Sequence, residues 1–158
     1  MNWSAIGAVG EIVGAMAVVA TLVYLAIQIR QNTAQNKAAS HQAISDSLNE
    51  INFLFAKSAD VSELWLKGMQ DRVGLTDGQR WQFDAMARAY FHVCETMFVQ
   101  AELGAGDRGI MVAEERGMKI VLAMPGGREW WMENPFGFSE EFREYVDHLM
   151  ASTTTRTG

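Results

Sequence analysis

The chain contains very little cysteine and proline. Its 158 residues include one cysteine, Cys94, and two prolines, Pro125 and Pro135. A single cysteine excludes an internal disulfide and is compatible with a reducing compartment. Because proline breaks helices, its scarcity favours an α-helical fold, and ten methionines suit helices with adaptable packing.

Basic residues are absent before Arg30. All 13 lysines and arginines lie at or after that position, against 18 of the 19 acidic residues, so this part has a net charge of −5. A mildly acidic chain without a basic cluster argues against nucleic acid as a partner.

Residues 5–27 form a long apolar run whose only charge is Glu11. A helix of this length spans roughly 35 Å, the thickness of a bilayer, and predicts a transmembrane helix within residues 1–29. The alternatives are a buried soluble helix and a cleaved signal peptide, which would have a basic start and a shorter apolar stretch. Arg30 and Lys37 follow the span, so the positive-inside rule predicts a cytoplasmic C-terminal part.

Small residues recur along one face of this predicted span. Their spacing of three, four, three and four places them on one side of a helix, where two backbones can approach closely in lipid and favour a homo-oligomer. The alternative is that small residues are simply common in membrane helices. The members of this small-residue face are Gly7, Gly10, Gly14, Ala17 and Thr21.

Glu11 lies on the flank of the small-residue face, roughly 80° around the helix from its centre. A carboxylate in hydrocarbon costs on the order of 2–3 kcal/mol. One interpretation is that it reaches the headgroups, or is neutral and hydrogen-bonded to a neighbouring helix. The other is a polar intramembrane site repeated around an oligomer, on an ion path.

The remainder of the chain predicts further helices and no strands. One helix is expected from about residue 4 to 57, because no glycine or proline interrupts residues 28–57. Residues 30–43 are polar and predict a helical stalk, residues 44–150 a bundle of about four to five helices, and residues 151–158 a disordered tail. The stripe that joins the long helix to the bundle is Ile44, Leu48, Ile51 and Phe55.

Capping signals divide the bundle. Ser58 or Asp60 begins a short helix, and Thr76 with Gln79 forms a capping-box pattern before a helix that runs to about residue 103, the expected centre of the bundle. Residues 125–127 predict a chain break before an aromatic segment, and Ser139 is expected to cap a last helix over residues 140–150. A further helix is expected over residues 109–124. The residues of this helix that are expected to face the core are Ile110, Ala113, Gly117, Ile120, Val121 and Met124.

Chemical motifs are weak. Residues 104–109 match G-x-G-x-x-G but follow a helix rather than a strand, which favours a helix–helix turn. His92 with Glu95, and Glu144 with His148, share helix faces without the order that a di-iron bundle needs. No catalytic residue, cofactor or metal site is therefore predicted, and Cys94 is expected to be a buried, inert thiol.

Two tryptophans in the aromatic segment, Trp130 and Trp131, have two interpretations. They either cover the core of the bundle or rest on a membrane surface or a partner. An aromatic-rich segment after a chain break is typical of the first arrangement.

Two strings carry a resemblance: GEIVGAMAVVATLVYLAIQIRQNT at residues 10–33 and MPGGREWW at residues 124–131. The chain resembles an uncharacterised family of small bacterial single-pass membrane proteins, in which an N-terminal span precedes a helical cytoplasmic domain. The resemblance implies this architecture and the bacterial inner membrane, and it assigns no functional residue.

The sequence thus predicts an all-α, membrane-anchored assembly or scaffold protein that self-associates or binds a larger membrane complex. Membrane lipids and further copies of the chain are the expected partners. The alternative is a small homo-oligomeric channel with Glu11 near its axis, and an enzyme is the least supported class.

Overall fold

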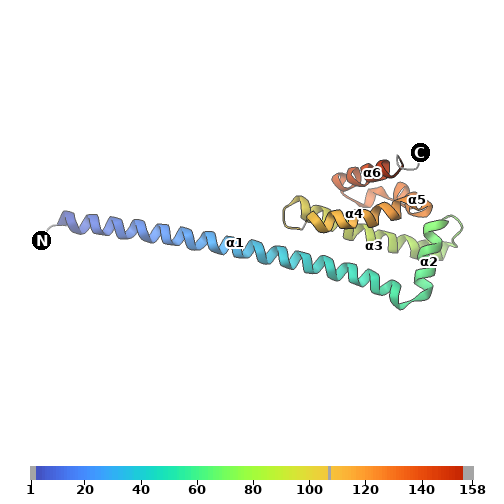
Figure 1. Cartoon of the computed structure of the whole chain (residues 1–158), viewed down its shortest axis with the longest axis horizontal. Coiled ribbons are helices and arrows are strands. Elements are labelled where there is room, and N and C mark those ends of the chain that lie inside the picture. Colours follow the sequence, from blue (N-terminus) through green and yellow to red (C-terminus); the bar gives the residue numbers. More distant parts are fainter. Residues whose placement is uncertain (1–2, 107, 155–158) are drawn as a thin grey trace. The chain divides into compact units, whose positions relative to one another are not determined.

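All regular structure in the computed structural model, which describes residues 3–106 and 108–154, is helical (Figure 1). This confirms the all-α prediction. The chain divides into two compact units, Met1–Ala39 and Ser40–Gly158. In order, the elements are α1 (Trp3–Lys57), α2 (Ala59–Gln70), α3 (Asp77–Glu102), α4 (Arg108–Ala123), α5 (Pro125–Glu133), a 3₁₀ turn (Pro135–Gly137) and α6 (Glu140–Thr154).

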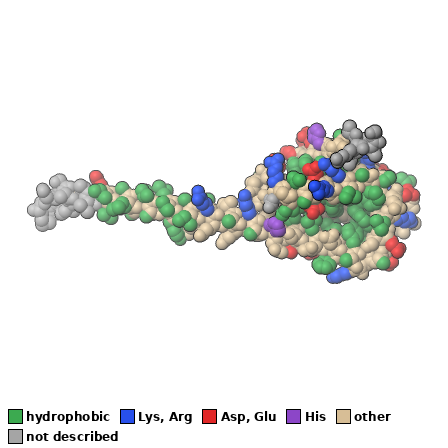
Figure 2. Space-filling model, viewed as in Figure 1, with side chains coloured by type: hydrophobic (Ala, Val, Ile, Leu, Met, Phe, Trp, Pro, Cys, Tyr) green, Lys and Arg blue, Asp and Glu red, His purple; other side chains and the backbone are tan. Residues whose placement is uncertain are grey.

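The first unit contains the N-terminal part of α1. Every residue from 10 to 39 is exposed, and hydrophobic side chains cover much of this segment (Figure 2). This is the one helix in the described chain that is long and apolar enough to cross a membrane, and no part of its most apolar stretch is buried. The expectation of one N-terminal helix able to span a membrane is confirmed on length and composition.

The second unit begins within α1, which continues unbroken to Lys57 as the sequence predicts. Ile44 is buried there, and Leu48 and Phe55 pack partly against the core. Ser40 is hydrogen-bonded to Gln100 of α3. The predicted apolar stripe therefore attaches the last part of α1 to the bundle.

Local capping signals set the starts of the next two helices. Ser58 accepts a hydrogen bond from the backbone N–H of Val61 at the start of α2. Thr76 and Gln79 form both bonds of the predicted capping box at the start of α3. Each arrangement satisfies backbone donors that have no partner within the first turn of a helix.

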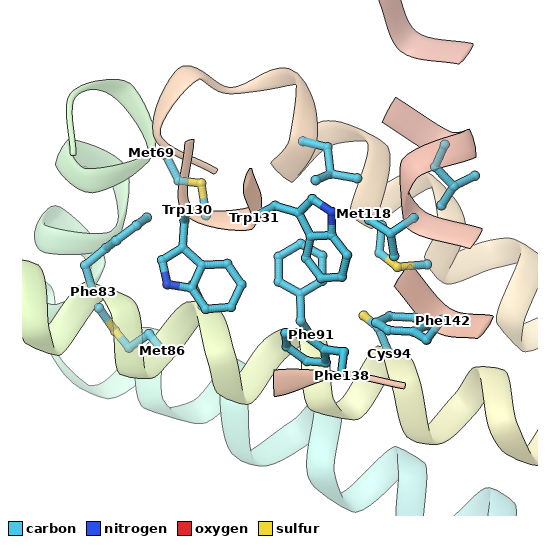
Figure 3. Packing of buried hydrophobic residues seen from close by; sticks show 14 of the residues in the cluster. Met69, Phe83, Met86, Phe91, Cys94, Met118, Trp130, Trp131, Phe138 and Phe142 are labelled. Carbon is cyan, nitrogen blue, oxygen red and sulfur yellow. The ribbon is translucent and has the colours of Figure 1, made fainter. Parts of the chain in front are cut away.

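The core of the second unit is built around α3, which contacts α2, α4, α5 and α6. This confirms the expectation that α3 is the centre of the bundle. Aromatic rings from α3 and α5 pack together: Phe91 stacks on Trp130 at 5.4 Å and lies tilted against Trp131 at 4.9 Å, centroid to centroid (Figure 3). Burial of one tryptophan contributes on the order of 4 kcal/mol before the entropy of ordering is subtracted.

The buried face of α4 differs from the prediction. Ile120, expected inside, is 68% exposed, whereas Met111, Met118 and Leu122 are buried. Apolar residues occupy most of the circumference of α4, so its own pattern does not select one face. The contacts of α4 with α3, α5 and α6 therefore determine which of its faces is buried.

The predicted chain break is observed at Met124, between α4 and α5, and not over residues 125–127, which form the first turn of α5. Pro125 occupies the start of the helix, where its missing N–H costs nothing. Gly126 lies directly against the backbone of Gly68 in α2, and an added Cβ would overlap the Gly68 carbonyl group. The missing side chain of Gly126 thus lets α5 pack against the backbone of α2, whereas the missing side chain of Gly68 leaves room for the Phe83 ring of α3.

The C-terminal helix extends further than expected. α6 continues through residues 151–154, which the prediction placed in a disordered tail, while residues 155–158 lie outside the described part. The carbonyl of Ser139 accepts a bond from Arg143, but its hydroxyl, the predicted cap, is buried without a partner among the described residues. Glu95 of α3 instead accepts the Ser139 N–H at 2.7 Å. The predicted hydroxyl cap is therefore not formed, and Glu95 instead anchors the backbone of Ser139 just before α6.

Candidate functional site

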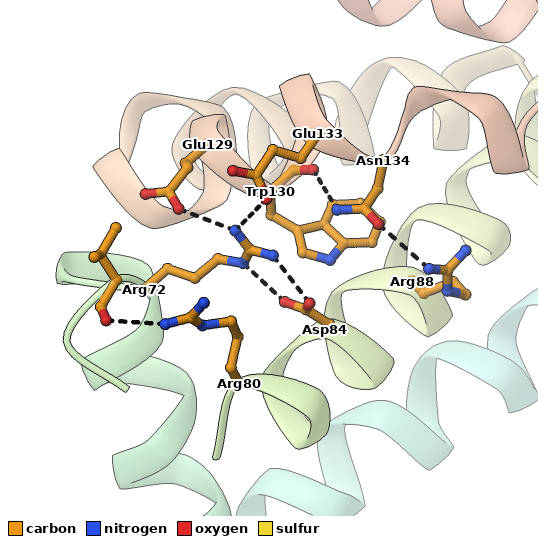
Figure 4. A network of polar contacts seen from close by, with 9 residues as sticks. Arg72, Arg80, Asp84, Arg88, Glu129, Trp130, Glu133 and Asn134 are labelled. Atoms are coloured by element: carbon orange, nitrogen blue, oxygen red, sulfur yellow. Dashed lines mark hydrogen bonds and ion pairs between the residues drawn. The ribbon is translucent and has the colours of Figure 1, made fainter. Parts of the chain in front are cut away.

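The main polar feature of the second unit is Arg72, which is 5% exposed. Its Nε and Nη2 donate to the two carboxylate oxygens of Asp84 in α3, at 2.8 and 3.0 Å (Figure 4). Its Nη1 donates to Glu129 at 2.9 Å and to Glu133 at 2.7 Å, both in α5. One buried guanidinium thus links the α2–α3 loop to two helices, and these four residues are called the Arg72 network below.

The loop that carries Arg72 is held by its own hydrogen bonds. Asp71 accepts the N–H of Gly74 at 3.0 Å, and the carbonyl of Arg72 accepts the N–H of Leu75 at 3.2 Å. Arg80 of α3 donates to the carbonyl of Val73 at 3.1 Å. The turn therefore fixes where the Arg72 side chain enters the bundle.

The guanidinium of Arg72 has little hydrogen-bonding capacity left for a ligand. Four of the five N–H donors of its guanidinium are engaged by carboxylates. The hydrogen bond to Asp84 is the main cause that raises the pKa of Arg72 above its ordinary value, although burial opposes it. The group remains a cation at any pH where proteins fold, and it acts as a clamp between elements rather than as a receptor for a ligand.

A hollow of about 550 Å³ lies beside this network on α3. This α3 hollow is large enough for a small organic ligand. Asp84 belongs to both features, and Asn134 closes the side formed by the segment after α5. The hollow is lined by Trp81, Asp84, Ala85, Arg88, Ala89, His92 and Asn134.

Arg88 is the cation of the α3 hollow. Its guanidinium lies over the ring of Trp130 at 6.0 Å from the centroid, and its Nη2 is 3.5 Å from Oδ1 of Asn134. A Cβ on Gly137 would approach its Nη1 to 3.1 Å, so a glycine leaves room for it. In the described chain no carboxylate pairs with Arg88, in contrast to Arg72.

The predicted small-residue face lies in the first unit. A Cβ added at Gly7, Gly10 or Gly14 would meet nothing within 4 Å, so no described part of the chain covers this face. The hydroxyl of Thr21 donates to the carbonyl of Ala17 at 2.8 Å. That bond satisfies the hydroxyl within the helix, as a lipid-facing or helix-facing position requires.

Glu11 is exposed on α1, and so the described chain offers it no burial. Its place relative to a membrane or to a second helix stays a prediction.

The two histidine–glutamate pairs found in the sequence lie on helices α3 and α6. Nδ1 of His92 lies 3.4 Å from Glu95, whose other oxygen binds the Ser139 N–H. Glu144 and His148 are exposed on α6. Nowhere in residues 3–106 and 108–154 do three or more His, Cys, Asp or Glu side chains gather as a metal ion would require.

The segment 104–109 joins α3 to α4, although residue 107 lies outside the described part. Gly104 has φ +67°, in the left-handed region that glycine adopts without strain. The helix–helix turn expected from the sequence is therefore observed, with no strand before it.

Cys94 is fully buried in α3, as predicted. Burial raises the pKa of its thiol to about 12, although a hydrogen bond with Tyr90 partly opposes this. Since the thiolate is the reactive form, the folded protein holds this cysteine inert.

Both tryptophans of the aromatic segment are in the core, in agreement with the first of their two interpretations. Trp131 donates its indole N–H to Asp147 at 3.0 Å. The indole N–H of Trp130 is buried and has no hydrogen-bond partner within the described residues, an arrangement that costs about 1–3 kcal/mol. In Figure 4 this nitrogen points toward α3, where Asp84 and Arg88 lie.

Sequence reasoning missed the Arg72 network and the α3 hollow. The usable signal was the spacing of Glu129 and Glu133, which places two carboxylates on one face of a helix. Nothing local connects them to Arg72, which is more than 50 positions earlier in the chain.

Comparison of the chain with protein-family models, with curated proteins and with solved structures produced no match.

Proposed function

We propose that this chain is a single-span helical scaffold protein of the bacterial inner membrane, which assembles through its span and keeps its second unit in the cytoplasm. The observation that carries the proposal is the uncovered small-residue face on an apolar helix whose residues from 10 to 39 are all exposed. Such a surface is compatible with lipid on most sides and with a second helix on the small-residue side.

Two further features support assembly rather than catalysis. Carboxylates accept hydrogen bonds from four of the five N–H donors of the buried Arg72, and burial raises the pKa of the Cys94 thiol. Neither group is therefore available as a receptor or as a nucleophile in the folded protein.

The test compares two substitutions that add the same side chain to different faces of the span. Gly14→Ile fills the small-residue face, whereas Ala15→Ile adds the side chain about 120° around the helix from its centre. Copies of the full-length chain are counted in nanodiscs by mass photometry, and the dissociation constant is measured by energy transfer between labelled chains.

The wild-type chain is expected to be oligomeric, and Gly14→Ile is expected to raise the dissociation constant at least about tenfold, or 1.4 kcal/mol. Ala15→Ile is expected to leave it unchanged. A monomeric wild-type chain, or equal effects of the two substitutions, refutes assembly through this face. The same count bears on the ion-conducting alternative, because that function also requires several copies around Glu11.

A further inference from the structure

The α3 hollow holds a cation without a counter-ion. Arg88 faces it, and in the described chain no carboxylate forms an ion pair with that guanidinium. An arginine that is positioned but not neutralised is typical of sites that receive a planar anion.

The rest of the lining is mostly apolar and flat. Ala85 and Ala89 lie one helical turn apart on α3 and present only methyl groups. Trp81 lies on the same helix and is 78% exposed, although it is the largest side chain of the lining. A flat apolar ligand body would cover these surfaces.

Two contacts orient the exposed side chain of Arg88 in the absence of a ligand. Its guanidinium rests over Trp130, and Asn134 lies within 3.5 Å of its Nη2. The Asn134 amide is itself fixed, because it donates to the carbonyl of Trp130 at 3.0 Å. Pre-positioned groups lose less freedom when a ligand binds.

The buried indole N–H of Trp130 belongs to a ring that Arg88 covers, and Trp130 does not line the α3 hollow. It has no partner among the described residues, and it points toward α3 where Asp84 and Arg88 lie (Figure 4). Arg88, rather than Trp130, is therefore the group that a ligand in the hollow would reach, and Trp130 would sense that ligand through Arg88.

The other charged groups near the hollow partly oppose an anion. Both oxygens of Asp84 accept hydrogen bonds from Arg72, but Arg72 shares its single charge with Glu129 and Glu133, so an anion must bind at Arg88, away from these carboxylates. His92 lies beside Glu95, whose carboxylate also binds the Ser139 N–H. Arg88 is therefore the cation that is left for a ligand.

The geometry points to a binding site in the α3 hollow for a small organic anion, a carboxylate joined to a flat, apolar body. The carboxylate binds Arg88, and the apolar body lies over Ala85, Ala89 and Trp81. The site is in the second unit, and it does not depend on how the span assembles.

The test uses the full-length chain in nanodiscs with its five tryptophans replaced by 5-fluorotryptophan, assigned by single Trp→Phe variants. The probe is 2-naphthoate, titrated to about 10 mM, since a ligand of this size binds in roughly the millimolar range. Its uncharged counterpart, 2-naphthalenemethanol, has the same ring system without the carboxylate.

We expect 2-naphthoate to shift the ¹⁹F signals of Trp81 and Trp130 but not that of Trp65, which packs against Phe55 and Phe83 away from the hollow. The uncharged alcohol is expected to bind at least about tenfold more weakly, because it lacks the partner of Arg88.

Arg88→Gln is expected to weaken 2-naphthoate binding at least about tenfold, and Arg88→Lys less. The matched control is Arg116→Gln, on the exposed surface of α4, which is expected to leave it unchanged. Trp81→Ala changes a largely exposed side chain and is expected to weaken binding without unfolding the bundle. The inference is overturned if Trp81 does not shift, if the alcohol binds as tightly, or if Arg88→Gln and Arg116→Gln bind 2-naphthoate equally.

Discussion

Gly126→Ala tests how α2 and α5 pack. The added methyl group would overlap the carbonyl oxygen of Gly68, lie 2.9 Å from its carbonyl carbon and lie 3.1 Å from the carbonyl oxygen of Met69. Ordinary contacts of a Cβ atom begin at 3.4 Å. The obstacles are backbone atoms, so no side-chain rotation relieves them, and the added methyl group and the Gly68 carbonyl oxygen must separate by more than about one ångström.

The expected cost follows from two opposing effects. Forced overpacking of a close-packed core costs about 1–3 kcal/mol, and a backbone obstacle places this site at the upper end. Alanine in place of a helical glycine returns up to about 1 kcal/mol. We therefore expect Gly126→Ala to lower the free energy of unfolding by about 2 kcal/mol.

Urea unfolding of the full-length chain in mild detergent, followed by tryptophan fluorescence, measures this change. Trp130 and Trp131 are fully buried in the second unit and report its unfolding. The control is Gly78→Ala near the start of α3, where an added Cβ meets nothing within 4 Å. It is expected to be neutral or stabilising by up to about 1 kcal/mol.

The reasoning is refuted if the two glycine variants unfold at the same urea concentration. It is also refuted if Gly126→Ala is more stable than the wild-type chain, because α2 and α5 would then not be in backbone contact.

Two further predictions concern the buried groups. Arg72→Met leaves Asp84 and two partly exposed glutamates without their cation, and is expected to lower the free energy of unfolding by about 2–3 kcal/mol, against no change for the exposed Arg116→Met. Arg72 is charged in the unfolded chain, where its pKa is ordinary, and in the folded protein, where its pKa is raised, so its own titration adds no pH dependence between pH 6 and 9. An effect of Arg72→Met no larger than that of the control would contradict its role as a clamp. Cys94 in the folded protein is expected to react with a thiol reagent at pH 8 about a thousandfold more slowly than in denaturant, because its pKa rises from 9.0 to about 12. Between pH 9 and 12 this thiol ionises in the unfolded chain but not in the folded protein, so the free energy of unfolding is expected to fall as the pH rises through this range. Comparable labelling rates in the folded and the denatured protein would show that Cys94 is not buried.

Several features were predictable because their causes are local. The capping box of Thr76 and Gln79 involves residues three positions apart, and the Ser58 cap reaches only to Val61. Such hydrogen bonds form within one helical turn, so both partners can be identified from the local sequence. One prediction failed where a distant element intervened, because the Ser139 hydroxyl forms no cap and Glu95 of α3 accepts the Ser139 N–H.

The candidate site shows the same division. The apolar character of α1 and the small-residue face follow from composition and period alone, whereas the α3 hollow requires residues from α3 and from the segment after α5. No spacing rule connects Arg88 to Asn134, which is 46 positions later.

By itself, the sequence determined that the chain is helical, where most of its helices begin, and that one helix is apolar enough for a membrane. These properties depend on turns of three or four residues and on mean composition. Only the tertiary structure decided which face of α4 is buried and that Gly126 lies against the backbone of α2. It also decided that Arg72 meets three carboxylates, while Arg88 pairs with none among the described residues. Those outcomes depend on packing between residues far apart in the chain, where shape and charge select one arrangement among several that the local pattern allows.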